Sequence, residues 1–172
     1  RQLADTLSEA QINGLGDNPT WNQIRSYAQA NNSTDRVNYS LYDADSRLKY
    51  SVNALGFVCE YVYDNNGSVI SKIEYDREIS LSETYSEQTV RDGLTRVGQG
   101  SDTRVTRYVY NGQNRLRFTI NAMGYASENI YDNMGNVLRT IHYVDKPELN
   151  NDFTIDAVDG VLQDLRQNEQ NR

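Results

Sequence analysis

Hydrophobic and polar residues alternate with a period of two in several segments of the chain. For example, Leu48, Tyr50 and Val52 alternate with the polar residues Lys49 and Ser51. The segments with this alternation are 48–52, 57–63, 69–75, 116–120, 125–131 and 137–143. A period of two places successive side chains on opposite faces of a strand, and strands bounded by Gly, Asn and Asp form antiparallel hairpins. The pattern therefore predicts a mainly β chain.

Short polar segments rich in Asn, Asp and Gly separate these strands and predict hairpin turns. The predicted turns lie at 43–46, 53–56, 64–67, 111–114, 121–124 and 132–135. Asn66-Gly67 and Asn111-Gly112 supply residues that tolerate the positive φ angles of tight turns. We expect a left-handed backbone at Gly67 and Gly135, where an Ala would cost on the order of 1 kcal/mol.

Between the strand blocks the hydrophobic period changes to that of a helix. Helix starts are predicted at Thr20, Thr84 and Thr154, and the first two match a capping box. We expect Gly93 to end the middle helix and Gly160 to weaken the last one. The predicted apolar faces are Trp21, Ile24 and Ala28 in the first helix, and Val158, Val161, Leu162 and Leu165 in the last.

One segment of the chain occurs twice. The segment 36–75 aligns without a gap on 104–143, and 16 of the 40 positions are identical. The distance from Arg36 to Arg104, 68 positions, is called the repeat period below. A fixed period of this length indicates an array in which each unit buries an apolar face against the next. The predicted organisation is a partial unit at 1–35, complete units at 36–103 and 104–171, and Arg172 as the start of the next unit.

A shorter spacing lies inside each copy. The distance from Tyr42-Asp43 to Tyr63-Asp64 equals that from Tyr110-Asn111 to Tyr131-Asp132. The pattern of a Tyr-Asp pair, a turn, an alternating strand and an Asn-Ala-x-Gly return resembles the YD (RHS) repeat family, over about half of the chain. The residues that carry the resemblance are Tyr42, Asp43, Asn53, Gly56, Tyr63, Asp64, Gly67, Tyr110, Asn121, Gly124, Tyr131, Asp132 and Gly135.

This resemblance implies tandem antiparallel β-hairpins that form a coiled or stacked sheet, with short helical inserts between the strand blocks. It also implies a segment of a large exported, bacterial-type protein, located outside the cell or on its surface, that builds a shell, stalk or filament. The alternative is an adhesin module that binds carbohydrate or protein through rows of exposed tyrosines. The tyrosines of these rows are Tyr61, Tyr63, Tyr108, Tyr110 and Tyr131.

The charge and composition narrow the range of partners. The chain has 17 basic and 24 acidic residues and a net charge of −7, which argues against binding to nucleic acid or to an anionic membrane. No apolar run approaches the roughly 18 residues of a membrane helix, and no signal peptide opens the chain. Because Arg1 stands in place of Met, we expect an excised piece of a longer protein.

Candidate chemical groups are few, and we expect neither an enzyme nor a cofactor or metal site. His142 is the single histidine and Cys59 the single cysteine, so a two-His metal site and an internal disulfide are excluded. Two acidic groups could recruit calcium, but neither matches an EF-hand loop, and turn capping is the favoured interpretation. These groups are Asp43 with Asp45, and Asp152 with Asp156 and Asp159.

The Gly14-Leu15-Gly16 segment lacks the spacing of a dinucleotide-binding loop and is interpreted as a plain loop.

The predicted array has open sheet edges. An edge strand presents unpaired N–H and C=O groups, and the chain has only two prolines to block pairing there. We therefore expect the chain to meet other copies of itself, or adjacent repeats of its parent chain, end to end at roughly 4.7–4.9 Å per strand. A glycan or a surface protein is the further expected partner.

Overall fold

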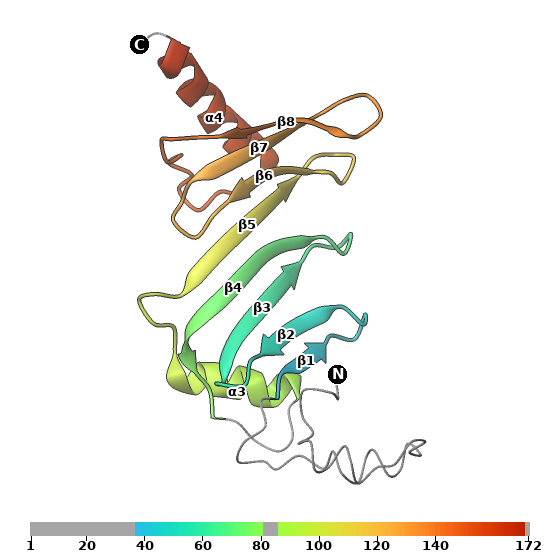
Figure 1. Cartoon of the computed structure of the whole chain (residues 1–172), viewed down its shortest axis with the longest axis vertical. Coiled ribbons are helices and arrows are strands. Elements are labelled where there is room, and N and C mark those ends of the chain that lie inside the picture. The colour runs from blue at the N-terminus through green and yellow to red at the C-terminus, as the bar shows by residue number, and fades with distance from the viewer. Residues whose placement is uncertain (1–36, 81–85, 171–172) are drawn as a thin grey trace, which may run out of the picture. The chain divides into compact units, whose positions relative to one another are not determined.

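The computed structural model describes residues 37–80 and 86–170, and the described part of the chain is mainly β (Figure 1). Its eight strands form one antiparallel sheet in which each strand pairs with the next one in sequence, and two helices accompany it. The elements are β1 Tyr39–Tyr42, β2 Leu48–Val52, β3 Phe57–Tyr63, β4 Val69–Glu78, α3 Glu87–Val97, β5 Arg104–Tyr110, β6 Leu116–Ile120, β7 Ala126–Tyr131, β8 Val137–His142 and α4 Ile155–Gln170. The mainly β prediction with short helical inserts is confirmed.

All six predicted turns are found at the predicted positions. In each one, the Asp or Asn that opens the turn accepts hydrogen bonds from the backbone amides of the second and the fourth residue after it. Asp64 Oδ1, for example, accepts from Asn66 N at 2.9 Å and from Ser68 N at 2.8 Å. Such bonds fix the turn locally, which is why the short polar segments alone were enough to locate it.

The fourth residue of every turn has a left-handed backbone. The prediction for Gly67 and Gly135 is confirmed, with φ angles of 84° and 90°. The prediction for Asn111-Gly112 is wrong, because the positive φ of 57° falls on Asn114 and not on Gly112. Since Asn114 N donates to Asn111 O and closes the turn, the fourth position takes the left-handed geometry in this hairpin as well.

The strand registers of the two copies are the same after a shift of one repeat period. Tyr50 lies opposite Glu60 in the β2–β3 pair, and Phe118 lies opposite Glu128 in the β6–β7 pair. The β1–β2 register returns in β5–β6, including the irregularity before Tyr42 in one pair and before Tyr110 in the other. The β3–β4 register returns in β7–β8 at every position that both pairs share. The duplication thus holds for backbone pairing as well as for sequence.

The helices follow the same shift, although their sequences did not align. α3 begins at Glu87, and α4 begins at Ile155, which is one repeat period later. Buried residues recur at this distance as well, because Val90 and Leu94 of α3 correspond to Val158 and Leu162 of α4. The structural duplication therefore extends beyond the aligned segments 36–75 and 104–143.

The start and end of α3 differ from the prediction. Ser86, and not Thr84, is the N-cap: its side chain accepts from Thr89 N at 3.1 Å, and Thr89 Oγ1 accepts from Ser86 N at 2.8 Å. Gly93 lies inside the helix and Gly98 caps its end. Ser and Thr are both favoured N-cap residues, so the residue type of Thr84 alone did not show that the helix begins two residues later.

Of the two glycines inside the described helices α3 and α4, one has a packing reason. A Cβ on Gly93 would come within 3.1 Å of Ile79 Cγ2, so the absence of a side chain lets α3 approach this residue. Gly160 argued against strong helicity in the last helix, and this expectation is wrong, because α4 runs through Gly160 without interruption from Ile155 to Gln170. Burial of the helical face outweighs the roughly 1 kcal/mol that an internal glycine costs.

Each set of four strands has its own apolar core together with its own helix. The first core consists of Leu41, Tyr50, Val52, Val58, Ile79, Val90 and Leu94. The second consists of Val109, Phe118, Ile120, Ala126, Tyr143, Leu149, Val158 and Leu162, with Val161 and Leu165 packed against it. The predicted apolar face of the last helix is therefore confirmed; the predicted helix at Thr20, with Trp21, Ile24 and Ala28, lies outside the described residues.

Candidate functional site

The tyrosines of the Tyr-Asp pairs tie neighbouring strands together through their hydroxyl groups. Tyr63 donates to Leu48 O at 2.8 Å, and Tyr131 donates to Leu116 O at 2.7 Å, so this bond recurs after one repeat period. Tyr110 reaches back to the preceding unit and donates to Val69 O at 3.0 Å. The tyrosines therefore serve as links within and between the units.

Arginines lie over the rings of the same tyrosines. The Arg47 guanidinium is 4.8 Å from the centroid of the Tyr63 ring, and Arg115 is 5.7 Å from that of Tyr131. Arg47 also pairs with Asp43 at 2.8 Å. The backbone N–H of Arg47 is the main cause of the lowered pKa of the Asp43 carboxyl, and the Arg47 guanidinium lowers this pKa further. The contacts of Asp43 and Tyr63 with Arg47 therefore fix the turn and the end of the neighbouring strand.

A buried glutamate is held by a tyrosine and two arginines. Glu128 is 1% exposed, and its Oε2 accepts from the Tyr143 hydroxyl at 2.6 Å and from Arg166 Nη2 at 2.7 Å. Its other oxygen pairs with Arg117 at 2.6 Å. Burial, followed by the bond to Glu128, raises the pKa of Tyr143 to about 12. Because Arg166 belongs to α4, the cluster attaches the helix to the sheet.

The first unit has the same arrangement in a simpler form. The Tyr75 hydroxyl donates to Glu60 Oε2 at 2.7 Å, and Lys49 pairs with Glu60 Oε1 at 3.1 Å. Burial, followed by the bond to Glu60, raises the pKa of Tyr75 above its ordinary value. These pairs were missed in the sequence, although Glu60 with Glu128 and Tyr75 with Tyr143 are identical between the copies, and that identity outside the turns was the available signal.

The candidate catalytic groups lie apart from one another. Cys59 is half-buried in β3 opposite Ser51 and Glu74, and burial raises the pKa of its thiol. A thiol in such surroundings is a poor nucleophile. His142 is exposed near the end of β8, opposite Ser127.

The acidic groups are occupied by local partners. Asp43 Oδ1 caps its own turn through Asp45 N and Arg47 N, while Asp152 Oδ1 accepts from Thr154 N at 3.0 Å just before α4. Asp159 lies 3.7 Å from both Arg117 and Arg166. Within residues 37–80 and 86–170, no group of three or more His, Cys, Asp or Glu side chains is arranged to hold a metal ion. The Gly14-Leu15-Gly16 segment lies outside these residues.

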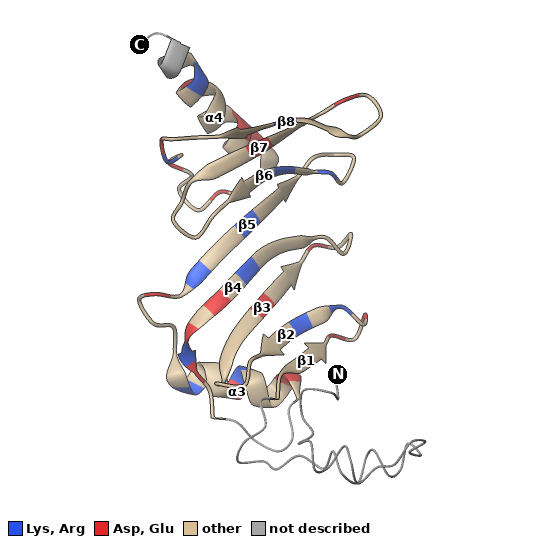
Figure 2. Cartoon of the chain, in the orientation of Figure 1, with Lys and Arg blue, Asp and Glu red and all other residues tan. Residues whose placement is uncertain are grey.

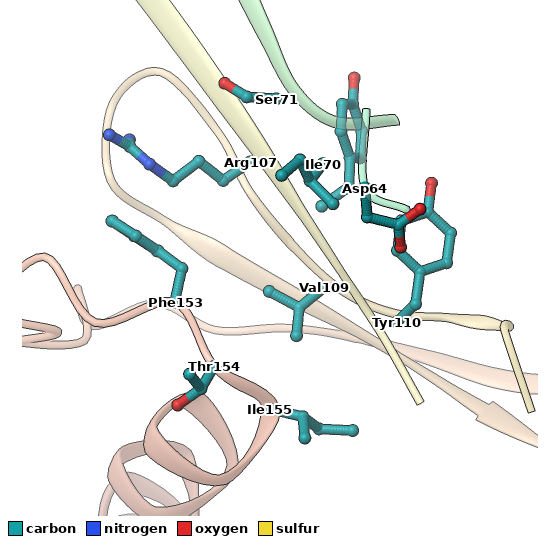
Figure 3. Close-up of a pocket in the computed structure, with 10 residues that line it drawn as sticks. Asp64, Ile70, Ser71, Arg107, Val109, Tyr110, Phe153, Thr154 and Ile155 are labelled. Atoms are coloured by element: carbon teal, nitrogen blue, oxygen red, sulfur yellow. The ribbon is translucent and has the colours of Figure 1, made fainter. Parts of the chain in front are cut away.

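A cavity of about 510 Å³ lies where β4 and β5 separate (Figure 3). The pairing of these strands ends at Ser71 and Arg107, and the start of α4 forms the opposite wall. The Arg107 guanidinium lies 4.0 Å from the centroid of the Phe153 ring at one end. Figure 3 shows Asp64 and Tyr110 at the other end and Ile70, Val109 and Ile155 between them. The lining has no nucleophile paired with a base.

The five tyrosines of the predicted rows do not form an exposed platform. Tyr61, Tyr63, Tyr108, Tyr110 and Tyr131 are all half-buried, whereas the adhesin alternative expected exposed rows. The hydroxyl groups of three of them bind backbone carbonyls of neighbouring strands. Lys, Arg, Asp and Glu are interspersed along β2 to β5, so these strands present no surface of a single charge (Figure 2).

No family model matches the chain, and no curated protein matches it closely enough to count as a relative. Among solved structures, the chain is similar to a chain in the crystal structure of TcdB2-TccC3-TEV, with a TM-score of 0.35 and 11% identity. The similarity covers 62% of this chain and 8% of the other, and at this level it does not establish a common fold. Among the described helices, none is both long and apolar enough to cross a membrane.

Proposed function

We propose that this chain is a structural segment of a long secreted or cell-surface YD-repeat (RHS) protein. In this proposal, units of one repeat period add hairpins to a continuous β-sheet that forms a shell, stalk or filament. The observation that carries the proposal is the agreement of the two registers, position by position, after a shift of one repeat period. A structural array needs this regularity, whereas a single catalytic or binding site does not.

The connection between the units supports the same function. β4 of the first unit pairs with β5 of the second from Ser71–Arg107 to Glu74–Arg104, so the sheet continues across the boundary. The Ser68 hydroxyl donates to Asn114 Oδ1 at 2.8 Å across the same boundary. The unit boundary therefore has its own backbone and side-chain bonds, which any further unit would repeat.

A chain with a third unit tests this function. The segment 104–171 is repeated after position 171, and backbone amide exchange is measured along β8 at a low protein concentration. In the unextended chain we expect β8 to exchange much faster than β4, because β4 has strands on both sides. In the extended chain β8 should become as slow as β4.

The control is a Gly and Ser extension of the same length as the added unit, which lengthens the chain without a strand pattern. It should leave the exchange of β8 unchanged. An authentic third unit that folds but leaves β8 in fast exchange would overturn the proposed function, since the units would then be independent hairpin sets.

A further inference from the structure

The cavity lined by β4, β5 and the start of α4 has an apolar interior. Ile70, Val109 and Ile155 form its middle, and Phe153 lies at one end (Figure 3). Its volume of about 510 Å³ falls within the roughly 300–1,000 Å³ of sites that bind small molecules. The cavity is therefore large enough for a small molecule with an apolar body.

A second and more polar cavity, of about 370 Å³, adjoins the first at the same end. Arg107 and Phe153 line both cavities, so this pair stands where the two meet. The lining of the second cavity also includes Asn121, Asn150 and Asn151. A charged head group beside Arg107 would thus have polar surroundings, while an apolar body attached to it would enter the first cavity.

Arg107 is a half-buried cation without an anionic partner among the described residues. Its guanidinium lies 4.0 Å from the centroid of the Phe153 ring, and no described residue forms an ion pair or a hydrogen bond with it. The half-buried Arg117 and Arg166, by contrast, both pair with Glu128. A carboxylate can accept two parallel N–H bonds from one guanidinium, so it is the group that complements Arg107 best.

The arginine and the phenylalanine at this junction are departures from the repeat. One repeat period earlier the sequence has Tyr39 and Tyr85 at the corresponding positions. The apolar Val109, in contrast, corresponds to the apolar Leu41. A unit of the sheet therefore does not require this cation over this ring, and residues that a scaffold does not require are where a binding site can be added.

We propose that this cavity binds a small monocarboxylic acid with an apolar body. The carboxylate pairs with the Arg107 guanidinium, and the body lies against Ile70, Val109 and Ile155. Asp64 stands at the far end of the cavity, so a second carboxylate on the ligand would meet a like charge there or lose its water inside (Figure 3). The inference goes beyond the proposed function, because it needs one cavity and not the array.

Three ligands with the same carbon chain test the charge requirement: decanoate, decan-1-ol and decanedioate. Calorimetry measures their binding to the full chain, and methyl NMR signals of Ile70 and Ile155 locate it. We expect decanoate to bind with a dissociation constant of about 100 μM and to shift both signals. Decan-1-ol and decanedioate should bind at least about fivefold and tenfold more weakly. Equal affinity for the acid and the alcohol would overturn the proposal.

Removal of the cation tests the role of Arg107. Arg107→Gln should weaken the binding of decanoate at least about tenfold and leave that of decan-1-ol unchanged. The matched control is Arg139→Gln, at an exposed arginine of β8, which should leave both affinities unchanged. Undiminished decanoate binding by a folded Arg107→Gln chain would remove the basis of the proposal.

A charge in the apolar part tests the position of the ligand body. Ile70 is 38% exposed, so Ile70→Glu should fold, which circular dichroism checks, and should abolish the binding of decanoate and decan-1-ol. The control is the same substitution at the equivalent position of β8, Leu138→Glu, since Leu138 is 72% exposed and does not line the cavity. Equal binding by the two variants would contradict the assigned position.

Two further outcomes would overturn the inference. One is the absence of heat and of methyl shifts up to about 2 mM decanoate. The other is binding of a short acetylated peptide that ends in leucine by a chain that does not bind decanoate, which would assign the cavity to a peptide C-terminus. Neither outcome affects the proposed structural function, whose test is the protection of β8 by a third unit.

Discussion

The hydroxyl of Tyr143, which directly follows β8, donates a hydrogen bond at 2.6 Å to Oε2 of the buried Glu128 in β7. Tyr75 and Glu60 make the same bond at 2.7 Å, one repeat period earlier. A buried carboxylate needs such partners, because its desolvation is otherwise costly. The pair is therefore a structural element of the unit that lies outside its turn motif.

Removal of this bond should destabilise the second unit. We expect Tyr143→Phe to lower the free energy of unfolding by about 1.5–3 kcal/mol, the usual value for a hydrogen bond to a charged group. Urea unfolding at low protein concentration measures it. The control is Tyr42→Phe, since Tyr42 is exposed and should change the stability of the single chain by less than about 0.5 kcal/mol. Equal effects of the two variants would contradict the structural role of the pair.

Tyr143 should make the stability of the folded chain depend on pH in the alkaline range. The pKa of Tyr143 is raised from 10.0 to about 12 in the folded chain. A raised folded pKa contributes stability that is complete below the unfolded pKa and is lost as the pH rises toward the folded pKa. The free energy of unfolding should therefore fall between pH 10 and pH 12, and Tyr143→Phe should flatten the fall. An unchanged slope in that variant would show that other groups dominate.

Two turn glycines should differ in their tolerance of a side chain. Gly67 has a φ of 84° and open space around it, so Gly67→Ala should cost about 1 kcal/mol. A Cβ on Gly56 would clash with the backbone oxygen of Ile79, so Gly56→Ala should cost about 2 kcal/mol more. Thermal and urea unfolding of both variants measure the difference. Equal losses would mean that the backbone angle alone sets the cost.

Acid should weaken the turns that Asp opens. The backbone N–H of Arg47 lowers the pKa of Asp43, and Asn136 lowers that of Asp132. A lowered folded pKa gives stability that is present above the ordinary value of 3.8 and is lost as the pH falls through the folded value. Asp43→Asn, which copies the natural Asn111, should therefore reduce the loss of stability on acidification. Unfolding measured from neutral pH down to strongly acidic pH checks this; an unchanged slope would count against it.

The turns were predictable from the sequence because their cause is local. At 64–67 and 132–135 the sequence shows an Asp that opens the turn and a Gly at its fourth position, where a left-handed backbone is expected. The structure has both turns. The exception at Asn111-Gly112 arises because the hydrogen bond to Asn111 O, rather than the glycine, decides which residue is left-handed.

The parts that were missed depend on contacts between distant residues. Gly160 lies in a helix because Val158 and Leu162 are buried in the second core, which no local propensity reports. The cluster around Glu128 joins β6, β7 and α4, and its two arginines have no arginine at the corresponding positions of the first copy. The cavity beside Arg107 depends on where the β4–β5 pairing ends, which side-chain alternation does not indicate.

The most direct test of a structural unit of one repeat period is the free energy of unfolding as a function of unit number. Chains with two, three and four covalent units are unfolded in urea at one low concentration. We expect the free energy and its urea dependence to rise with each added unit, because each addition contributes its own core and one more boundary like β4–β5. Added units that unfold in a separate transition, with the stability of the first two unchanged, would contradict the structural repeat.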